Sequence, residues 1–218
     1  MKIKNLILAF VQSKHESRPH YQIHASAEIS EQAKVQDGTS IWNFSQVLGD
    51  AQIGSNCIIG RYVFIDSGVI IGKNCKIQNN ATIYSPSIIG NGVFIGPGVI
   101  FTNDAYPRAV NPNGIIKSAS DWESVGVEIA DGASVGAGVI CVAPVRVGAW
   151  AMVAAGAVVT RDVPDFALFA GVPARQLGWI CKAGHRIQIS EINPGPILCS
   201  VCKDLYALRN GYLYEVSS

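Results

Sequence analysis

Residues 57–101 read CIIGRYVFIDSGVIIGKNCKIQNNATIYSPSIIGNGVFIGPGVIF and place an isoleucine or phenylalanine at every sixth position, from Ile59 to Phe101. The same spacing extends back to Ile23, and after a gap it resumes at Ile129 and runs to Val159. A period of six over this length is neither the 3.6 period of a helix nor the 2.0 period of a strand, and such self-similarity indicates a solenoid. The pattern predicts an all-β parallel β-helix of about seven coils, with three six-residue sides per coil.

Two further rows follow the same period. Four residues after each bulky residue comes a small or β-branched side chain, so that both point inward and fill a narrow triangular tube. One residue earlier stands a type that tolerates positive φ: Gly38, Asp50, Asn56, Gly68, Asn74, Asn80, Gly92, Gly98, Gly132, Gly138 and Gly156. Cys57 and Cys75 fall on the small row and Cys141 on the bulky row, which predicts a packing role for these three thiols.

The composition restricts the class of protein. Apolar residues make up 49% of the 218-residue chain and charged residues 15%, which suits one elongated domain with a continuous core. The formal charge of +1 gives no general attraction to nucleic acid or anionic lipid. The apolar run Leu6–Val11 is too short to span a membrane, and we expect a short helix there, in a cytoplasmic protein.

We expect four segments along the chain. Residues 1–22 form a lead-in, and residues 23–160 form the β-helix, interrupted by a loop-out at 102–128 that is rich in Asn, Pro and Ser. Residues 161–177 are an exit segment, and residues 178–218 are a small terminal module. Many outward positions are apolar or small, so the flat sides are expected to associate, and the triangular section favours a homotrimer.

Between Ala25 and Gly184 the chain has no histidine, which excludes a histidine base within the coils and counts against a β-helical carbonic anhydrase. Amides and acids cluster instead around the loop-out, at Gln78–Asn80 and at Thr102–Asp104. The two clusters need not share a side of one chain, whereas a neighbouring subunit would bring them together. Asn80 lies on the turn row, which explains it structurally, while Asn79 lies outside that row and is the stronger functional candidate.

Several stretches carry a resemblance to a known family: IWNFSQV, KIQNNATIY, VFIGPGVIFTND with Pro107 and Arg108, AAGAVVTRDVPDFALFAGVPAR, and GWICKAGHRI. Over about residues 23–190 the chain resembles the hexapeptide-repeat acyltransferases. Among these it is most similar to enzymes that N-acetylate the 3-amino group of UDP-linked 2-acetamido-3-amino glucuronate or dTDP-linked 3-amino-3,6-dideoxyhexoses. Such enzymes commonly read IWHFSH in the first stretch, where this chain has Asn43 and Gln46.

The resemblance implies a left-handed β-helix and acetyl transfer from acetyl-CoA, in the synthesis of a surface glycan such as the O-antigen of lipopolysaccharide. A neutral sugar amine is already a nucleophile, so the protein must mainly orient the two substrates, and the leaving thiolate can accept the amine proton. The catalytic candidates are Asn79, Asn80, Asn103 and Asp104, with Asp104 as the alternative base. An acid in such a turn is more often structural.

Matching positions in similar enzymes suggest the binding residues. For acetyl-CoA they are Ala154, Ala155, Gly156, Thr160, Arg161, Pro173 and Arg175, with Arg175 favoured because a guanidinium pairs with phosphate in a forked geometry. For the sugar nucleotide we expect contacts from Arg61, Gln78, Tyr84, Phe101 and Arg108. The terminal module spaces Cys181, His185, Cys199 and Cys202 as C-x3-H-x13-C-x2-C, which is a candidate structural zinc site with four protein ligands.

Two other readings compete with this one. O-acetylation of a sugar or of serine would need a base to activate a hydroxyl, and the histidine-free coils count against it. A non-catalytic solenoid that binds a surface such as ice would want a regular row of outward threonines, but the four threonines, at positions 39, 82, 102 and 160, form no row. A scaffold would need neither the AGVPAR exit nor the loop-out.

Overall fold

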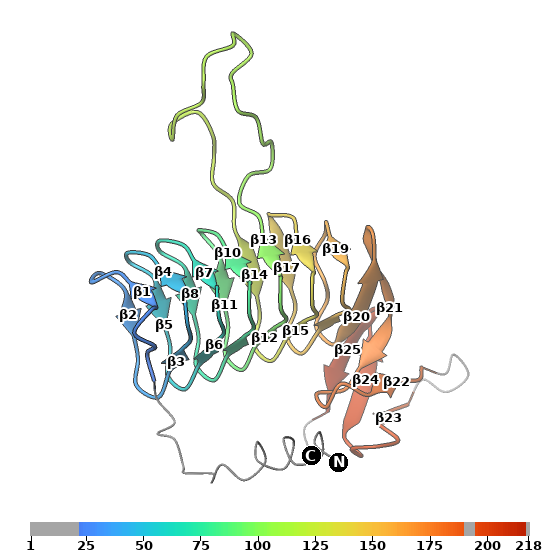
Figure 1. Cartoon of the computed structure of the whole chain (residues 1–218). Helices are drawn as coiled ribbons and strands as arrows, with labels where there is room; N and C mark the ends of the chain where they lie inside the picture. Colours follow the sequence, from blue (N-terminus) through green and yellow to red (C-terminus); the bar gives the residue numbers. More distant parts are fainter. Residues whose placement is uncertain (1–21, 190–194, 217–218) are drawn as a thin grey trace, which may run out of the picture.

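The computed structural model describes residues 22–189 and 195–216, and within them every regular element is a strand. Most of the lead-in, including the expected helix at its start, lies outside these residues. The chain winds into a left-handed parallel β-helix with a triangular cross-section, and a long arm projects from one edge (Figure 1). No helix in the described ranges is long and apolar enough to cross a lipid bilayer.

Three sheets form the three sides of the tube. Side 1 contains, in coil order, β3 (Ser40–Ile41), β6 (Ile58–Ile59), β9 (Lys76–Ile77), β12 (Phe94–Ile95), β15 (Ser134–Val135) and β18 (Met152–Val153), and continues into β20 (Ala167–Gly171), β21 (Ala174–Ile180) and β22 (Arg186–Ile187). Side 2 contains β1 (Glu28–Ile29), β4 (Gln46–Val47), β7 (Phe64–Ile65), β10 (Thr82–Ile83), β13 (Ile100–Phe101), β16 (Ile140–Cys141) and β19 (Val158–Val159). Side 3 contains β2 (Lys34–Val35), β5 (Gln52–Ile53), β8 (Ile70–Ile71), β11 (Ile88–Ile89), β14 (Val127–Ile129) and β17 (Val145–Val147).

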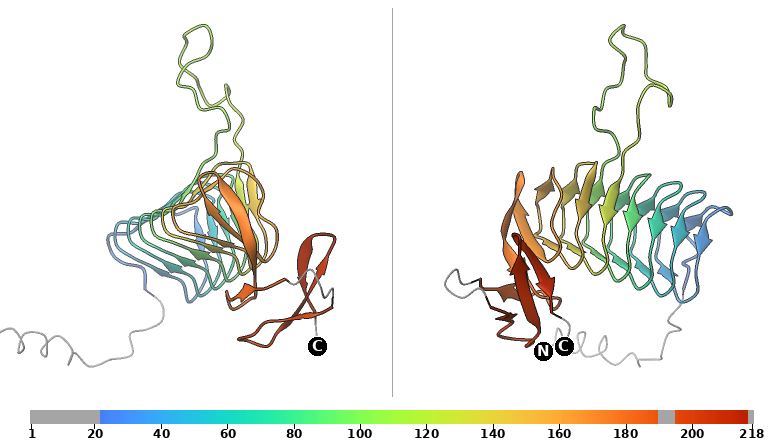
Figure 2. Two further views of the ribbon diagram at one scale, coloured as in Figure 1. Left: turned by 90° about the vertical axis from the view of Figure 1, so that its right-hand side faces the viewer. Right: turned by 180° about the vertical axis from the view of Figure 1, so that it is seen from behind.

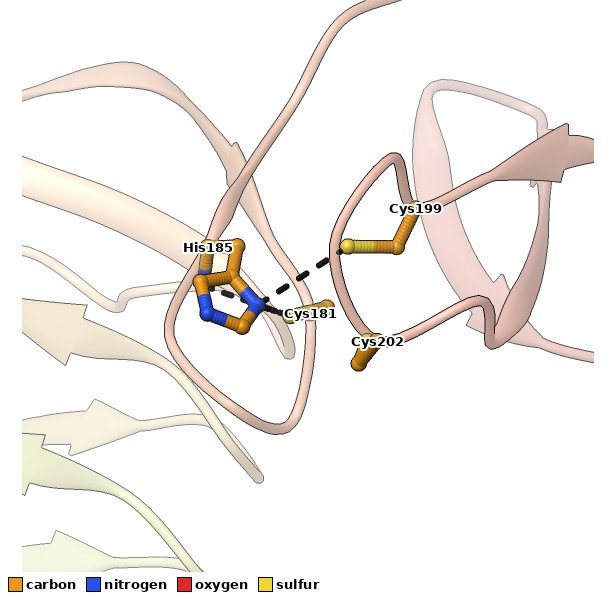
Figure 3. Close-up of side chains that lie close together, drawn as sticks. All are labelled: Cys181, His185, Cys199 and Cys202. Atoms are coloured by element: carbon orange, nitrogen blue, oxygen red, sulfur yellow. Dashed lines mark hydrogen bonds between the residues drawn. The ribbon is translucent and has the colours of Figure 1, made fainter.

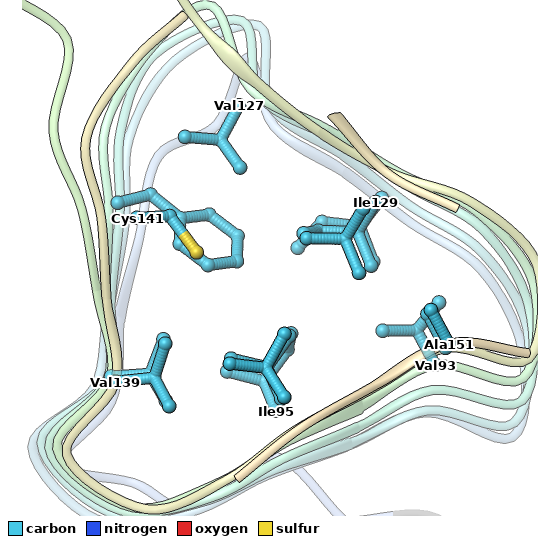
Figure 4. Close-up of a cluster of buried hydrophobic side chains, with 14 of the residues drawn as sticks. Val93, Ile95, Val127, Ile129, Val139, Cys141 and Ala151 are labelled. Carbon is cyan, nitrogen blue, oxygen red and sulfur yellow. The ribbon is translucent and has the colours of Figure 1, made fainter. Parts of the chain in front are cut away.

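The seven strands of side 2 agree with the predicted number of coils. The bulky row points inward as expected, and each of its residues from Ile41 to Val159 is at most 2% exposed. Figure 4 shows how the inward side chains of successive coils stack, with Ile95 and Ile129 on two sides and Cys141 on the third. Cys141 is fully buried, and this burial raises the pKa of its thiol to about 12. The interior therefore has the packing that the six-residue period predicts.

The turn row is also confirmed, since all eleven of its predicted residues have positive φ. Three aromatic residues on the same row share that conformation: Phe44, Tyr62 and Trp150 have φ of 58°, 55° and 57°. An aromatic side chain at positive φ is unfavourable in isolation, so the coil register must hold these residues in place.

The loop-out occupies the corner between side 2 and side 3. It leaves after β13 and rejoins the tube at β14, which begins at Val127, earlier than the boundary at 128 that the sequence predicts. The arm starts with a bridge between Asp104 and Ser124, and a second antiparallel bridge joins Val110 to Ile116 further out. The tube continues around it, because Ile89 in β11 pairs with Ile129 in β14 as though the arm were absent.

The C-terminal end of the tube carries the remaining strands. Strands β20 to β22 extend side 1 as antiparallel hairpins, and a separate sheet of β23 (Ile197–Leu198), β24 (Leu205–Arg209) and β25 (Tyr212–Glu215) lies beside them (Figure 2). The side chain of Tyr206 is fully buried and its ring meets Phe166 edge-on, with 5.6 Å between centroids. This contact joins the small sheet to the last coil.

Glycine at the coil corners either leaves room for the backbone of the next coil or adopts a positive φ. The turn that contains Gly96 and Gly98 has one glycine of each kind. A Cβ at Gly96 would lie 2.6 Å from the backbone nitrogen of Ala137 in the next coil, whereas a Cβ at Gly98 would meet nothing but carries a φ of +67°. We expect Gly98→Ala to cost about 1 kcal/mol, the penalty for a left-handed alanine. Gly96→Ala should cost more, about 2–3 kcal/mol, because backbone has to move. Equal shifts in the urea midpoints of the two variants would contradict this assignment.

Candidate functional site

The predicted polar residues divide between two corners of the tube. Corner 1/2, between side 1 and side 2, contains residues 42–45, 60–63, 78–81, 96–99, 136–139 and 154–157. Corner 2/3, between side 2 and side 3, contains Tyr84, the base of the arm, Thr160 and Arg161. Gln78–Asn80 therefore lie on a different corner from Asn103 and Asp104, with side 2 between them. This separation within one chain agrees with the expectation that the two clusters need not share a side.

Asn79 sits in the middle of corner 1/2 and caps the coil before it. Its side-chain oxygen accepts a hydrogen bond from the backbone N–H of Arg61 at 2.8 Å. Asn91 makes the equivalent bond to the N–H of Lys73 at 3.0 Å on the corner between side 3 and side 1. The expectation that Asn79 lacks a structural explanation is therefore wrong. A carbonyl oxygen accepts two hydrogen bonds, so the exposed amide keeps capacity for a ligand.

Towards the C-terminal end, the same corner loses its side-chain caps. The row of Asn79 continues through Pro97 and Ala137 to Ala155, and these residues are exposed. The backbone N–H groups of Ala137 and Ala155 have no acceptor among the described residues. Three coils separate Asn79 from Ala155, or about 14 Å at the spacing of stacked strands. Small side chains thus leave unpaired backbone donors along a smooth, accessible edge.

Towards the N-terminal end, corner 1/2 carries an aromatic stack that the sequence analysis missed. The rings of Phe44 and Tyr62 lie 5.1 Å apart and 20° from parallel, and the two residues are 53% and 57% exposed. Asn43 donates from Nδ2 to Nε2 of His24 at 2.9 Å, just before this stack. The sequence did contain a signal for this stack, because aromatic residues are unusual on a turn row made mostly of Gly, Asn and Asp. An exposed, stacked pair of rings offers a flat apolar surface for a ligand.

At the base of the arm, the polar groups have structural partners. Oδ1 of Asp104 accepts the backbone N–H of Tyr106 at 2.7 Å, and the carbonyl of Asn103 accepts the N–H of Val125 at 3.0 Å. Arg108 is exposed further along the arm, within a concavity that Tyr106 and Pro107 also line. The arrangement favours a turn-forming role for Asp104 over that of a base.

The exit segment turns back as the β20–β21 hairpin. Pro173 and Arg175 are exposed on it, and the Arg175 guanidinium donates to the carbonyl of Ala174 at 2.9 Å. Thr160 and Arg161 are exposed at the preceding corner. All four side chains are accessible near the last coil, as a ligand-binding role requires.

The terminal module brings its four candidate metal ligands together (Figure 3). The ligand atoms of Cys181, His185, Cys199 and Cys202 all lie within 4.8 Å of one another. Nδ1 of His185 is 3.3 Å from Sγ of Cys181 and 3.9 Å from Sγ of Cys199. Backbone N–H groups of Cys202 and Val201 lower the pKa of the Cys199 thiol to about 6. Three thiols and one imidazole fit a closed zinc site and leave no open position for a substrate.

The sequence model for bacterial transferase hexapeptide repeats (six repeats) matches residues 22–67 and 68–103. Over these residues the chain has the hexapeptide repeat of that family. Its six-residue period, inward rows and positive-φ corners, described above, are the structural form of that repeat.

Several other proteins are similar to this chain over part of their length. A dTDP-3-amino-3,6-dideoxy-alpha-D-galactopyranose 3-N-acetyltransferase from Aneurinibacillus thermoaerophilus is 47% identical over 60 residues, covering 28% of this chain and 31% of that protein. The bifunctional protein GlmU from Nostoc sp. is 31% identical over 168 residues, covering 76% of this chain and 32% of that protein. The chain thus spans about a third of the length of these relatives.

Among solved structures, a hexapeptide transferase family protein from Anaplasma phagocytophilum is similar in fold. The TM-score is 0.51 at 22% identity, and the match covers 75% of this chain and 81% of that one.

One of the substrate contacts predicted from the sequence is wrong. Phe101 is 0% exposed, because it occupies the bulky inward row in β13 and its ring fills the tube. The other candidates for that role are accessible or partly so: Arg61, Gln78, Tyr84 and Arg108. Asn80 has a φ of 61°, which agrees with the structural reason given for it from the sequence.

Proposed function

We propose that this protein transfers the acetyl group of acetyl-CoA to the 3-amino group of a nucleotide-linked amino sugar. The observation that carries the proposal is corner 1/2, which is accessible along its length and has an aromatic stack at one end, a central amide, and unpaired backbone donors on the row of that amide towards the other end. These three parts suit a nucleobase, a sugar amine and the amide-containing arm of a coenzyme. The similarity to a nucleotide-sugar 3-N-acetyltransferase supports the same substrate class.

For acetyl-CoA, the proposed binding edge is Ala154–Gly156. Gly156 and Ala155 are exposed, and the free N–H of Ala155 is available to a carbonyl of the pantetheine arm. Thr160, Arg161, Pro173 and Arg175 lie beyond it on the last coil and the exit hairpin. The two arginines supply positive charge for the phosphates.

For the sugar amine, the proposed anchor is the side-chain oxygen of Asn79. An amine N–H donates to this oxygen, which leaves the nitrogen lone pair free to attack the thioester carbonyl. Gln78, Asn80 and Arg61 on the same corner are the accompanying candidates for the sugar nucleotide, together with Tyr84 on corner 2/3. The unpaired N–H of Ala137 lies between the amine and the coenzyme edge and is suited to hold the oxyanion that forms on attack.

The proton balance of this reaction needs no strong base. The attacking amine loses a proton as the C–N bond forms and the C–S bond breaks, and the departing thiolate accepts it. Asp104 is the alternative acceptor, together with Asn103 at the base of the arm. Its occupied Oδ1 and its place on corner 2/3 make it the weaker candidate.

A second subunit would complete this site, and we propose a homotrimer. The outward residues of side 2 are uncharged from Gln46 onward: Gln46, Phe64, Thr82, Ile100, Ile140 and Val158. The arm exposes large apolar groups, among them Tyr106 at 84% and Ile116 at 77%. Packing side 2 against a neighbour would bury these surfaces and bring one subunit's corner 1/2 near another's corner 2/3, which contains Asn103 and Arg108.

The buried thiols and the proposed cosubstrate also suggest a cellular setting. Cys57, Cys75 and Cys141 are buried free thiols, which suit the reducing cytoplasm, where acetyl-CoA is available. An acetylated nucleotide sugar is a donor for glycan assembly. We therefore propose a role in surface glycan synthesis, such as that of lipopolysaccharide O-antigen.

The decisive experiment is thiol release from acetyl-CoA with a panel of UDP- and dTDP-linked 3-amino sugars, alongside analogues that carry a hydroxyl at C3. Turnover confined to the amines is expected, because the chain has no histidine between Ala25 and Gly184 to activate a hydroxyl beside the proposed amine anchor. Turnover of the hydroxyl analogues would favour an O-acetyltransferase. If no compound of the panel were turned over, a non-catalytic solenoid would be favoured.

Asn79 and Asn91 make a matched pair for testing the amine anchor. Each caps one backbone N–H, so either alanine variant should lose about 1 kcal/mol of stability, and Asn91→Ala also loses an exposed contact between Nδ2 and Asp131. Only Asn79→Ala should also reduce kcat/KM, by about 10²-fold, because only Asn79 lies on corner 1/2. If the two variants keep equal activity on the preferred sugar, Asn79 is a structural cap and nothing more.

Arg175 is tested through the coenzyme. Arg175→Ala should raise KM for acetyl-CoA about five- to tenfold, as expected for one charge-assisted contact to phosphate at an accessible site. With acetyl-pantetheine, which has no phosphates on its arm, the same variant should match the unaltered protein. Arg209→Ala removes an exposed arginine from β24 and serves as the control. An unchanged KM for acetyl-CoA would exclude Arg175 from the coenzyme site.

A further inference from the structure

The sheet formed by β23, β24 and β25 has very little core of its own. Among residues 195–216 only Cys199, Tyr206 and Leu213 are buried, while Leu198 and Val201 are 55% and 61% exposed. A sheet of three short strands with so few buried side chains needs an additional constraint to stay folded. None of the cysteines in the described ranges forms a disulfide that would supply it.

The direct contacts between this sheet and the tube are also few. The Tyr206 hydroxyl accepts the backbone N–H of Lys182 at 3.0 Å, and the Lys182 ammonium pairs with the carboxylate of Glu215. The Lys182–Glu215 pair is partly exposed, and such pairs contribute little to stability. Apart from these contacts and the packing of Tyr206 on Phe166, the two parts meet at a pair of turns, one from each part.

Each of these turns contributes two possible metal ligands. Cys181 and His185 flank the turn between β21 and β22, which belongs to the extension of side 1. Cys199 and Cys202 flank the turn between β23 and β24, which belongs to the small sheet. We propose that these four residues bind one structural Zn²⁺ ion and that this ion fastens the C-terminal sheet to the end of the β-helix.

The geometry is close to that of a tetrahedral zinc site. With Zn–S bonds of about 2.3 Å, the sulfurs of such a site lie about 3.8 Å apart. The present ligand atoms all lie within 4.8 Å of one another, so a contraction of about 1 Å completes the cage. Cys181 is buried and His185 is half-buried, so the ion would be largely shielded from solvent.

Both turns are already shaped to present their ligands. In the first, the N–H of His185 donates to Sγ of Cys181 at 3.2 Å, and the N–H of Gly184 donates to the Cys181 carbonyl at 2.8 Å. In the second, the N–H of Lys203 donates to the Cys199 carbonyl at 3.1 Å. The thiol of Cys202 donates to Asp204, and zinc binding would displace that proton to solvent. Little backbone rearrangement is therefore needed for binding.

The site would be distinct from the proposed acetyl-transfer site in residues and in purpose. Four protein ligands fill a tetrahedral shell, so no position remains for water or substrate. The ion would act on the stability of residues 195–216. Its presence is thus testable whether or not the protein transfers acetyl groups.

The first test measures metal content in the full chain purified after zinc-replete expression. We expect about one Zn²⁺ per chain, and below 0.1 in His185→Ala. His185→Cys should retain the ion, because a fourth thiolate replaces the imidazole, and packing alone would not predict that rescue. Cys141→Ala removes a buried coil thiol and should keep the ion. Zinc-free protein, or equal zinc in His185→Ala, would overturn the proposal, and a disulfide between these cysteines would be the alternative explanation of the cluster.

The second test asks whether the ion fastens the sheet. A strong chelator should accelerate proteolysis after residue 190 at least tenfold, while the β-helix stays intact, and added Zn²⁺ should reverse the effect. Replacing the ion with Co²⁺ should give the visible absorption of a tetrahedral thiolate site. Proteolysis that is indifferent to chelator in a zinc-loaded protein would remove the structural role.

Discussion

Hydrogen bonding between stacked coils is the constraint on which the rest of the structure depends. Each short strand pairs in register with the strand one coil away, so that Ile59 lies beside Ile77 and Ile77 beside Ile95. In this register the bulky residue of each strand points into the interior. Only the outward positions and the corners are therefore available to bind a ligand. A row of residues along one corner thus becomes a linear site, and corner 1/2 has the polar, aromatic and backbone groups to serve as one.

The fold was predictable because the six-residue period expresses this register directly. A bulky inward residue, a small inward residue and a turn residue recur along the chain, and the structure confirms all three rows. Residue type alone could not place Phe44, Tyr62 and Trp150 at positive φ. At these three positions the hydrogen-bonded strands on either side fix the backbone, and this outweighs the preference of an aromatic residue for negative φ. The predicted loop-out ended at residue 128, too late, because Val127 already pairs with the next coil as part of β14.

The site was less predictable, and the reasons are specific to each residue. Phe101 lies on the bulky row, so its burial could have been foreseen, but its nearness to the loop-out suggested a ligand contact instead. The cap made by Asn79 joins residues 18 apart, which is the predicted length of one coil, but the spacing does not show that this side chain bonds to the backbone N–H of Arg61. A signal existed in the glycines, because Gly60 and Gly72 each precede a capped N–H and leave room for the capping side chain. The cluster of Cys181, His185, Cys199 and Cys202 was foreseeable in composition, whereas its closeness depends on how two hairpins meet.

The arm shows what a corner can tolerate. Across it, Asn91 and Asp131 bond to each other although they are 40 residues apart, while the same contact elsewhere spans 18. The pairing of strands between coils is the same on both sides of the arm, so an insertion at this place changes the outline of the molecule but not the tube. Evolution could therefore vary the length and chemistry of such an insertion freely. A solenoid of this type can acquire new selectivity one corner at a time, with its folding left as it was.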